Sequence, residues 1–383
     1  MTISKFKSGT LRWLSVSDVH LGHLRTSTSF ILANLRRELF DGKIANLDLL
    51  IIAGDLFERL LEFNHPDKGE IMMFVDDLMT ECSIYNVKLR VLEGTPSHDN
   101  KQNVIFVDLY NLGHYVNCDL KYVDTLSVEY IEEWDMRILY VPDRIRATVE
   151  EIYSDTLDIF KSLGITRVDM AVMHGAFKHQ LPPMAKEVHD PEAWLRLVKH
   201  WILVGHVHFH SIRDRIAAQG SFDRLSQGEE GPKGYLMGST NLGGDEKKDE
   251  IYFIENKHAK KYVTIDCTDL TTDESFEKIK LAIAGFPSDS FIRIRAEKGN
   301  PILSDMRTIK SLDLGNNWSS ISNDDIEDVT DEDNAVVEEG LEDWIPIVII
   351  PNNIEDIILN RLAAKQHTFE TIELARSFIN EYK

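Results

Sequence analysis

The chain has 383 residues, 43% of them hydrophobic, and a formal net charge of −22. This length and apolar content exclude a disordered protein and predict two or three structural units. The three cysteines (Cys82, Cys118 and Cys267) are far apart in sequence, which argues against a disulfide scaffold or a thiolate zinc site and predicts a cytoplasmic protein. We expect neither a signal peptide nor a transmembrane helix, because no apolar run is long enough.

The negative charge is concentrated in one segment. Residues 311–360 contain 14 of the 64 acidic side chains and no Lys or Arg. The rest of the chain carries 42 basic side chains against 50 acidic ones (64 less 14). The average charge therefore says little about any single face of the protein, and it does not exclude a nucleic-acid partner.

The first 210 residues alternate between strand-like and helix-like stretches. Residues 11–20 (LRWLSVSDVH) are predicted to form a strand, and residues 29–44 a helix, because apolar residues recur there at helical spacing. Residues 47–55 (LDLLIIAGD) form a continuous apolar run, as expected of a strand buried on both faces. Further strands are predicted at 87–94, 136–143 and 167–175, helices at 71–86 and 148–164, and a helix passing into a strand at 194–210. This alternation predicts an α/β fold.

The second half divides into smaller parts. Residues 213–255 are rich in glycine and charge and predict short strands and turns, so the first domain is placed at 1–259. Residues 260–310 read as strand, helix, strand and predict a small α/β domain. Residues 311–345 are acidic and aperiodic and predict a linker. Residues 346–383 carry apolar side chains at helical spacing and predict a C-terminal helical segment.

Polar residues follow five of the predicted strands at the point where each strand ends. Ligands of open α/β sheets bind outside the carboxyl ends of the strands, so these residues are expected to meet at one edge. The five groups are Asp18 with His20, Gly54 with Asp55, Ser97-His98-Asp99, His174 with Gly175, and Gly205-His206-Val207-His208.

These residue types predict a metal site. Carboxylate and imidazole ligands suit Mn, Fe, Zn or Co. In an extended backbone, D-x-H and H-x-H place both side chains on one side, so Asp18 with His20, and His206 with His208, could each contact a shared region. Asp55 could bridge two ions about 3.5–4 Å apart, a pair suited to displacement at a phosphoryl group. Apart from G-H-x-H, which is as often functional as not, each motif alone is more often a turn, a cap or a core histidine. The prediction rests on all five in order.

The whole series resembles the calcineurin-like metallophosphoesterase superfamily. More narrowly, DVHLG (18–22), GDLFE (54–58), GHVH (205–208) and GSFDRLSQGEEGPKGY (220–235) resemble the SbcD/Mre-type DNA repair nucleases. The motifs cover residues 11–255, and the likeness extends loosely to 310. The resemblance implies a four-layer αββα sandwich with a small α/β cap domain.

The resemblance also implies a mechanism. One ion, most often manganese in that family, is expected on Asp18, His20, Asp55 and His208, and a second on Asp55, His174 and His206. His98 is expected to protonate the leaving oxygen, because the pKa of histidine lies near working pH, and Asp99 is expected to orient it.

The sequence departs from the family at residues 94–99 (GTPSHD). The family places an Asn directly before this histidine, and the Asn is a ligand of the second ion. Here Ser97 has that place, and two residues are added after Gly94. Either Ser97 is a ligand, or a water fills the gap, or a neighbour such as Asn100 reaches in.

The resemblance implies a metal-dependent DNA exo- and endonuclease in DNA repair and recombination. An SbcC-type SMC-like ABC ATPase is the expected partner, bound through residues 346–383, and a homodimer is expected. The alternatives are another metallophosphoesterase, acting on phosphoproteins or nucleotides, and a scaffold with a weakened second metal site. Loop residues that could meet DNA are Arg25, Arg59, His65, Arg144, Arg146 and Lys178. Histidines expected to lie outside the metal site are His23, His179, His189, His200 and His210.

Overall fold

The computed structural model describes residues 9–40, 42–62, 64–113, 118–144, 147–182, 184–243, 246–312 and 315–322. The chain divides into two compact units, Met1–Glu327 and Asp328–Lys383, and the described residues all belong to the first. Most of the predicted linker, the whole predicted C-terminal segment and Arg146 therefore lie outside the described residues.

The first large sheet has six strands in the order β12-β11-β1-β2-β3-β4. The strands β1 to β4 are parallel, and β11 and β12 complete the sheet as antiparallel strands. Parallel strands need crossover connections, and helices supply them here. The elements are β1 (Thr10–Val16), α1 (Thr28–Leu39), β2 (Leu49–Ala53), α2 (Lys68–Tyr85), β3 (Lys88–Leu92), α3 (Ile105–Leu112), β4 (Asp119–Val123), β11 (Gly234–Asn241) and β12 (Glu250–Glu255).

The second large sheet also has six strands, in the order β5-β6-β7-β8-β10-β9. The strands β6, β7, β8 and β10 are parallel, and β5 and β9 form antiparallel edges. Its elements are β5 (Ser127–Ile131), β6 (Met136–Val141), α4 (Val149–Leu163), β7 (Met170–His174), α5 (Pro191–Leu197), β8 (Ile202–Gly205), β9 (Ser211–Arg213) and β10 (Ile216–Ala218). Short 3₁₀ helices occur at Ile44–Asn46 (η1), Gln102–Val104 (η2), Glu132–Trp134 (η3) and Glu246–Lys248 (η4).

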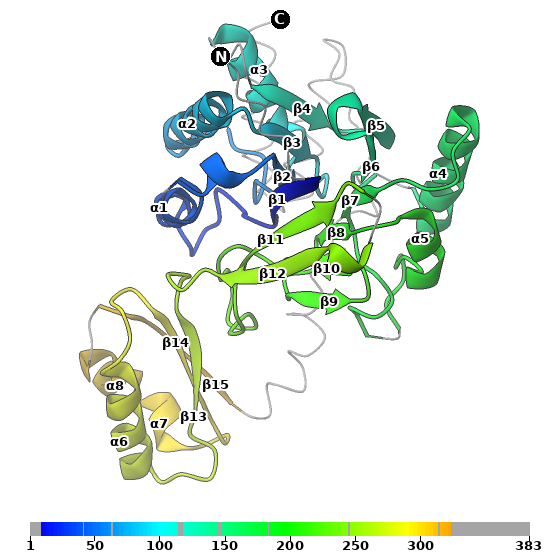
Figure 1. The fold of residues 1–383 in the computed structure, drawn as a ribbon. Coiled ribbons are helices and arrows are strands. Elements are labelled where there is room, and N and C mark those ends of the chain that lie inside the picture. The colour runs from blue at the N-terminus through cyan, green and yellow to red at the C-terminus, as the bar shows by residue number, and fades with distance from the viewer. Residues whose placement is uncertain are drawn as a thin grey trace, which may run out of the picture. The chain divides into compact units, whose positions relative to one another are not determined.

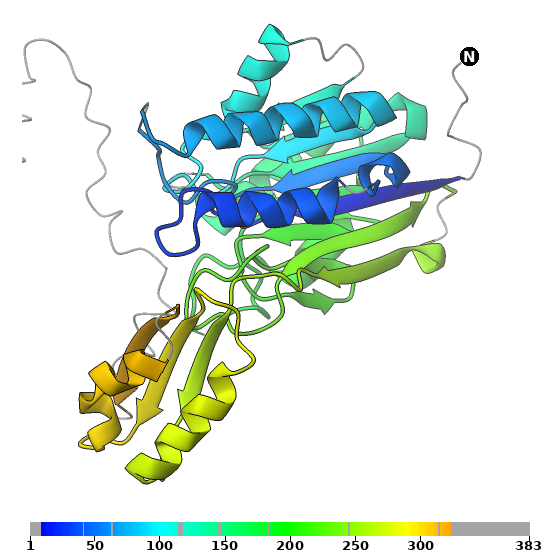
Figure 2. The same ribbon diagram turned by 90° about the vertical axis from the view of Figure 1, so that its left-hand side faces the viewer.

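The two sheets pack face to face and carry helices on their outer faces. Side chains alternate across a strand, so Trp13 of β1 enters the core between the sheets while Leu14 enters the core under the helices. Figure 1 shows α1 and α2 on one side of the paired sheets and α4 and α5 on the other; α1 and α2 lie side by side over the first sheet (Figure 2). The predicted α/β class is confirmed as a sandwich of two large mixed sheets.

Local sequence explains where the helices begin and end. In α4, Thr148 and Glu151 form a reciprocal capping box, and Gly164 ends the helix in a left-handed conformation. In α1, the Ser27 side chain accepts the first free backbone N–H, from Phe30. Among the described residues, no helix combines the length and the apolar character needed to cross a bilayer.

A third, three-stranded sheet belongs to the small α/β domain. Its strands are parallel in the order β13-β14-β15, and its helices cover a separate apolar core. The elements are β13 (Tyr262–Asp266), α6 (Thr272–Ile283), β14 (Phe291–Ala296), α7 (Pro301–Ser304), α8 (Met306–Leu312) and β15 (Asn317–Ser322). The predicted boundary at residue 310 is wrong because it falls inside α8 and omits β15. The sequence of β15, NWSSIS, is polar and does not predict a strand, yet β15 pairs with β14 along its whole length.

Candidate metal centre

The five predicted groups do converge on one edge of the sandwich. His174 is the last residue of β7, and Asp18, Asp55 and His206 come just after β1, β2 and β8. The strands β1 and β2 are parallel neighbours in the first sheet, and β7 and β8 are parallel neighbours in the second. Because β2 contacts both β7 and β8 across the interface, the carboxyl ends of all four strands meet.

The backbone at the site is unusual. The φ angles are +51° at Asp18, +56° at His20, +50° at Asp55 and +96° at His206. A positive φ is uncommon outside glycine and persists only where the surroundings hold it. The predicted reason for the pairing of Asp18 with His20 is therefore wrong: both residues follow β1 in a left-handed turn, and strand alternation does not align them.

Two glycines make the close approach of these turns possible. A Cβ on Gly54, which has a φ of +89°, would lie 2.3 Å from His174 Nδ1. A Cβ on Gly94 would lie 2.2 Å from the backbone nitrogen of Asp55. Any side chain at either position would displace Asp55 or His174.

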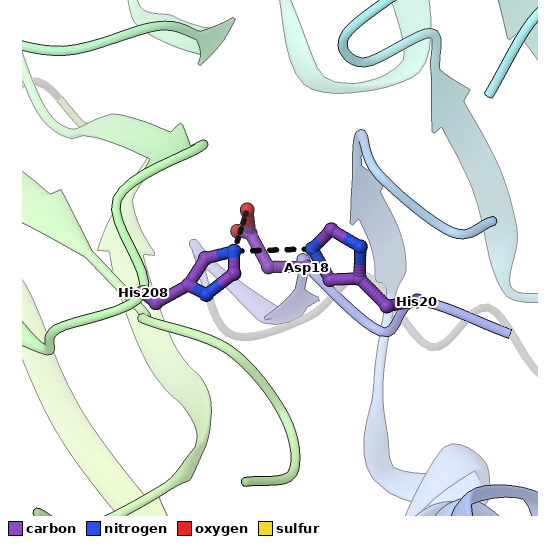
Figure 3. Close-up of side chains that lie close together, drawn as sticks. All are labelled: Asp18, His20 and His208. Atoms are coloured by element: carbon purple, nitrogen blue, oxygen red, sulfur yellow. Dashed lines mark hydrogen bonds and ion pairs between the residues drawn. The ribbon is translucent and has the colours of Figure 1, made fainter. Parts of the chain in front are cut away.

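The first cluster contains Asp18, His20 and His208. Figure 3 shows the two imidazole rings facing each other beside the Asp18 carboxylate. The Nε2 atoms of the two histidines are 3.1 Å apart, and His208 Nε2 is 3.8 Å from Asp18 Oδ1. The carboxylates of Glu58 and Glu229 lie 2.8 and 2.7 Å from the Nδ1 atoms of His20 and His208.

These partners determine the tautomers. A carboxylate accepts a hydrogen bond from the ring, so the neutral form of each ring carries its proton on Nδ1 and presents a lone pair on Nε2. Two lone pairs 3.1 Å apart beside a carboxylate repel each other unless a positive charge lies among them. The first cluster is therefore built for a cation.

The second cluster contains Asp55, His174 and His206. His174 Nδ1 donates to the Ala53 carbonyl at 2.9 Å, which leaves a lone pair on Nε2. That Nε2 is 3.2 Å from Asp55 Oδ2, and both side chains are buried. A lone pair facing a carboxylate again needs a cation, either a proton or a metal ion.

The pKa values reflect the same electrostatics. Burial lowers the pKa of His20, but the hydrogen bond to Glu58 and the charge of Asp55 outweigh it and raise the pKa to about 9. Burial likewise acts against the charged form of His174, and the Asp55 carboxylate raises its pKa to about 10. The charge of His174 holds the pKa of Asp55 well below its usual value, although burial opposes this. Each cluster therefore attracts one added positive charge, and His and Asp clusters of this kind could bind a metal ion.

The hydroxyl that lies in the second cluster belongs to Thr95. Its Oγ1 atom is 3.1 Å from Asp55 Oδ2, 3.2 Å from His174 Nε2 and 3.4 Å from His206 Nδ1. The predicted placement of Ser97 is wrong, because Ser97 is exposed two residues farther along the loop. Asn100 is also exposed. Pro96 and Ser97 thus separate Thr95 from His98.

His98 lies beside the first cluster but is oriented differently from the prediction. Its ring centroid is 5.0 Å from that of His20, and its Nδ1 donates to the Glu58 carbonyl at 2.6 Å. Asp99 does not orient it. The Asp99 carboxylate accepts backbone N–H groups from Asp55 (3.0 Å), Phe57 (2.9 Å) and Gly94 (2.7 Å), which joins the loops after β2 and β3.

Two glutamates that the prediction did not assign hold the first cluster. Glu58 contacts His20 through its carboxylate and His98 through its carbonyl. Glu229 contacts His208 and also accepts from Lys233 Nζ at 2.9 Å, and Lys233 in turn donates to the His208 carbonyl at 2.9 Å. The motifs GDLFE and GSFDRLSQGEEGPKGY contain these residues, but spacing alone does not reveal which ring each one contacts.

The remaining predicted residues lie around the site in varied roles. Arg144 is paired with Asp155, and Lys178 with Asp190, so neither cation is free in this structure. None of the five histidines expected to lie outside the site joins a cluster of the described residues. His23 accepts a hydrogen bond from the Thr26 N–H, His200 pairs with Asp249, and His210 donates to the Ala218 carbonyl. His179 and His189 pack on Phe177. His65, a candidate DNA contact, accepts a hydrogen bond from the Asp67 N–H.

Comparison with known proteins adds little. No family model matches the chain, and no curated protein matches it in sequence. The structure of TT1561 of Thermus thermophilus aligns over 64% of this chain and 99% of its own, with 12% identity and a TM-score of 0.38. A second solved structure aligns over 64% of this chain and all of its own, with 13% identity and a TM-score of 0.38. Likenesses this distant support no conclusion about activity.

Proposed function

We propose that this protein is a two-metal-dependent phosphoesterase of the calcineurin-like kind. The observation that carries the proposal is the pair of clusters in which imidazole lone pairs face carboxylates or each other. Asp18, His20 and His208 would hold one ion, and Asp55, His174 and His206 the other, with Asp55 as the bridging carboxylate. Such a pair of ions acidifies an attacking water and stabilises the charge of a phosphoryl group in displacement. Mn²⁺ suits this donor set.

His98 is the proposed general acid. The Glu58 carbonyl holds the proton on Nδ1, so the ring can gain and donate a second proton at Nε2. The ring is only half-buried, which leaves it open to a substrate next to the first cluster. Asp99 supports this arrangement indirectly, because it ties the His98 loop to the backbone at Asp55.

The narrower proposal is a DNA nuclease of the SbcD/Mre type, acting at or near DNA ends in repair and recombination. The proposal is supported by the order of the motifs DVHLG, GDLFE, GHVH and GSFDRLSQGEEGPKGY along the chain. It is also supported by the contacts that the last motif makes with His208. Ser221, Glu229 and Lys233, from GSFDRLSQGEEGPKGY, build the hydrogen-bonded network on His208. A small α/β unit follows the last motif in the chain, which supports the proposal because the cap of those nucleases follows it in the same order.

We further propose that residues 346–383 bind an SbcC-type ATPase and that the nuclease is a homodimer. This proposal rests on the helical spacing of apolar residues in a segment outside the described residues. Deletion of 346–383 should abolish ATPase binding in a pull-down and leave basal nuclease activity in place. Binding that survives the deletion would contradict the proposal.

The nuclease proposal is tested with purified protein, Mn²⁺ and linear duplex or single-stranded DNA. His98→Ala should reduce cleavage by about 10²–10⁴-fold, the usual contribution of a general acid, without loss of bound metal. His258→Ala, which removes an exposed histidine outside both clusters, is the matched control and should cleave normally. Intact DNA with every metal, together with rapid hydrolysis of a phosphopeptide or nucleotide, would favour the alternative phosphoesterase.

A further inference from the structure

We infer that the Thr95 hydroxyl is a protein ligand of the second ion, and that this makes the second ion the more weakly held of the two. The inference rests on the proposed two-metal function and assigns to it a donor that no motif predicted. The resembled family is expected to use an Asn as a ligand here, and in this chain the Thr95 hydroxyl lies among the atoms of the second cluster.

The hydrogen bonds open to Thr95 Oγ1 do not satisfy all of its neighbours. Asp55 Oδ2, at 3.1 Å, can only accept, and His174 Nε2, at 3.2 Å, presents a lone pair in the neutral ring, whose Nδ1 donates to Ala53. The hydroxyl has one proton to donate. Whichever of the two acceptors receives it, the other still faces the lone pairs of the hydroxyl. A positive charge among the three atoms removes this conflict: a second proton on His174 Nε2 in the metal-free protein, or a metal ion that would displace this proton and bind all three atoms.

Thr95 is also firmly held in place. Its backbone N–H donates to Asp55 Oδ1 at 2.6 Å, and its carbonyl accepts from the N–H groups of His98 and Asp99 at 2.9 and 3.0 Å. Pro96 follows it directly and disfavours the helical conformation for Thr95. The hydroxyl is therefore positioned before any ion arrives, as a ligand must be.

The chemistry of the two clusters explains the difference in affinity. Hydroxyl oxygens of Ser and Thr bind hard divalent ions, as the P-loop hydroxyl binds Mg²⁺, but they carry no net charge. The first cluster has two imidazoles backed by the carboxylates of Glu58 and Glu229, and such partners raise ligand basicity. In the second cluster, His174 is backed only by the Ala53 carbonyl. We therefore expect the cluster with Thr95 to fill at higher metal concentration.

The test measures Mn²⁺ binding to the full chain by electron paramagnetic resonance of the free ion. Wild type should bind two ions with different affinities. Thr95→Val, which keeps the shape and removes the hydroxyl, should weaken the weaker site by at least about tenfold and spare the tighter one. Thr95→Ser should retain the affinity of the weaker site. Ser97→Ala removes an exposed hydroxyl nearby and should change neither site.

A second variant reports ligation directly. Thr95→Cys places a soft thiolate ligand at this position and should produce a thiolate-to-metal absorption band when Cd²⁺ is added, whereas Ser97→Cys should not. Two unchanged affinities in Thr95→Val, or no band in Thr95→Cys, would overturn the role of Thr95 and leave the two-metal function standing. A wild-type chain that binds no pair of ions would overturn both.

Discussion

The two candidate metal clusters differ in what supports their histidines. In the first cluster, the carboxylates of Glu58 and Glu229 lie against the Nδ1 atoms of His20 and His208. In the second, a backbone carbonyl supports His174, and the Thr95 hydroxyl lies among the ligand atoms. Because the ligands are similar, we expect the different supports to set the difference in metal affinity between the clusters. The first cluster is expected to be the permanent site and the second the exchangeable one.

The largest expected effects come from removing one carboxylate from each cluster. Asp55→Asn should lower metal-dependent hydrolysis by about 10³-fold or more. If Asp55 bridges the two ions, this variant should also fail to bind either of them. Asp18→Asn should fail to bind only the first ion. Metal analysis after dialysis, expressed as ions per chain, separates the two outcomes. Loss of the same single ion in both variants would contradict the assignment of the clusters.

Glutamate variants should affect the first cluster alone. Glu58→Gln keeps a hydrogen-bond acceptor near His20 but removes the charge, and it should weaken the tighter Mn²⁺ site by about 10–100-fold. The weaker site should be unchanged in the same titration. If both sites weaken equally, the carboxylate partners of the histidines do not cause the difference in Mn²⁺ affinity between the clusters.

Loss of Glu229 should also destabilise the fold. The Lys233 side chain is 1% exposed and paired with Glu229 at 2.9 Å. Glu229→Ala would leave that ammonium buried without its partner, a change that costs about 3 kcal/mol in unfolding free energy. Urea denaturation measures the difference, and Lys233→Met in the same background should restore part of it. A Glu229→Ala variant as stable as wild type would show that the pair is not buried in solution.

The stability of the metal-free protein and its Mn²⁺ affinity should change with pH in opposite directions. The folded-state pKa values of His20 and His174 are raised to about 9 and about 10, so without metal both rings are protonated near pH 7. Their protonation stabilises the metal-free protein fully below pH ~6.5, and this contribution is lost as pH rises towards 9–10. Metal displaces the same protons, so Mn²⁺ affinity should fall as pH falls. Calorimetry in two buffers of different ionisation enthalpy measures the released protons; no release would contradict the raised pKa values.

Much of the site followed from the sequence because each motif ends an apolar run. The runs before Asp18, Asp55, His174 and His206 are strands, and parallel strands bring their carboxyl ends together. This reasoning finds which residues meet, but it does not find how they are oriented.

The errors came from features that sequence does not display. The position directly before His98 predicts Ser97 as the ligand, yet the loop turns so that the Thr95 hydroxyl lies in the cluster. The sequence predicts that Asp99 orients His98, but the Asp99 carboxylate accepts three backbone N–H groups. The serine-rich β15 has a linker-like composition, and α3, β4 and β5 lie in a stretch for which no element was predicted. In each case a tertiary contact decides what the local pattern leaves open.

The most direct test of the two-metal centre is an anomalous-scattering map from crystals of the full chain grown with Mn²⁺. We predict two peaks, one among Asp18, His20 and His208 and one among Asp55, His174 and His206, with the second peak reaching the Thr95 hydroxyl. Full occupancy should need less Mn²⁺ at the first peak than at the second. A map with no peak at either cluster, at saturating Mn²⁺, would contradict the two-metal centre.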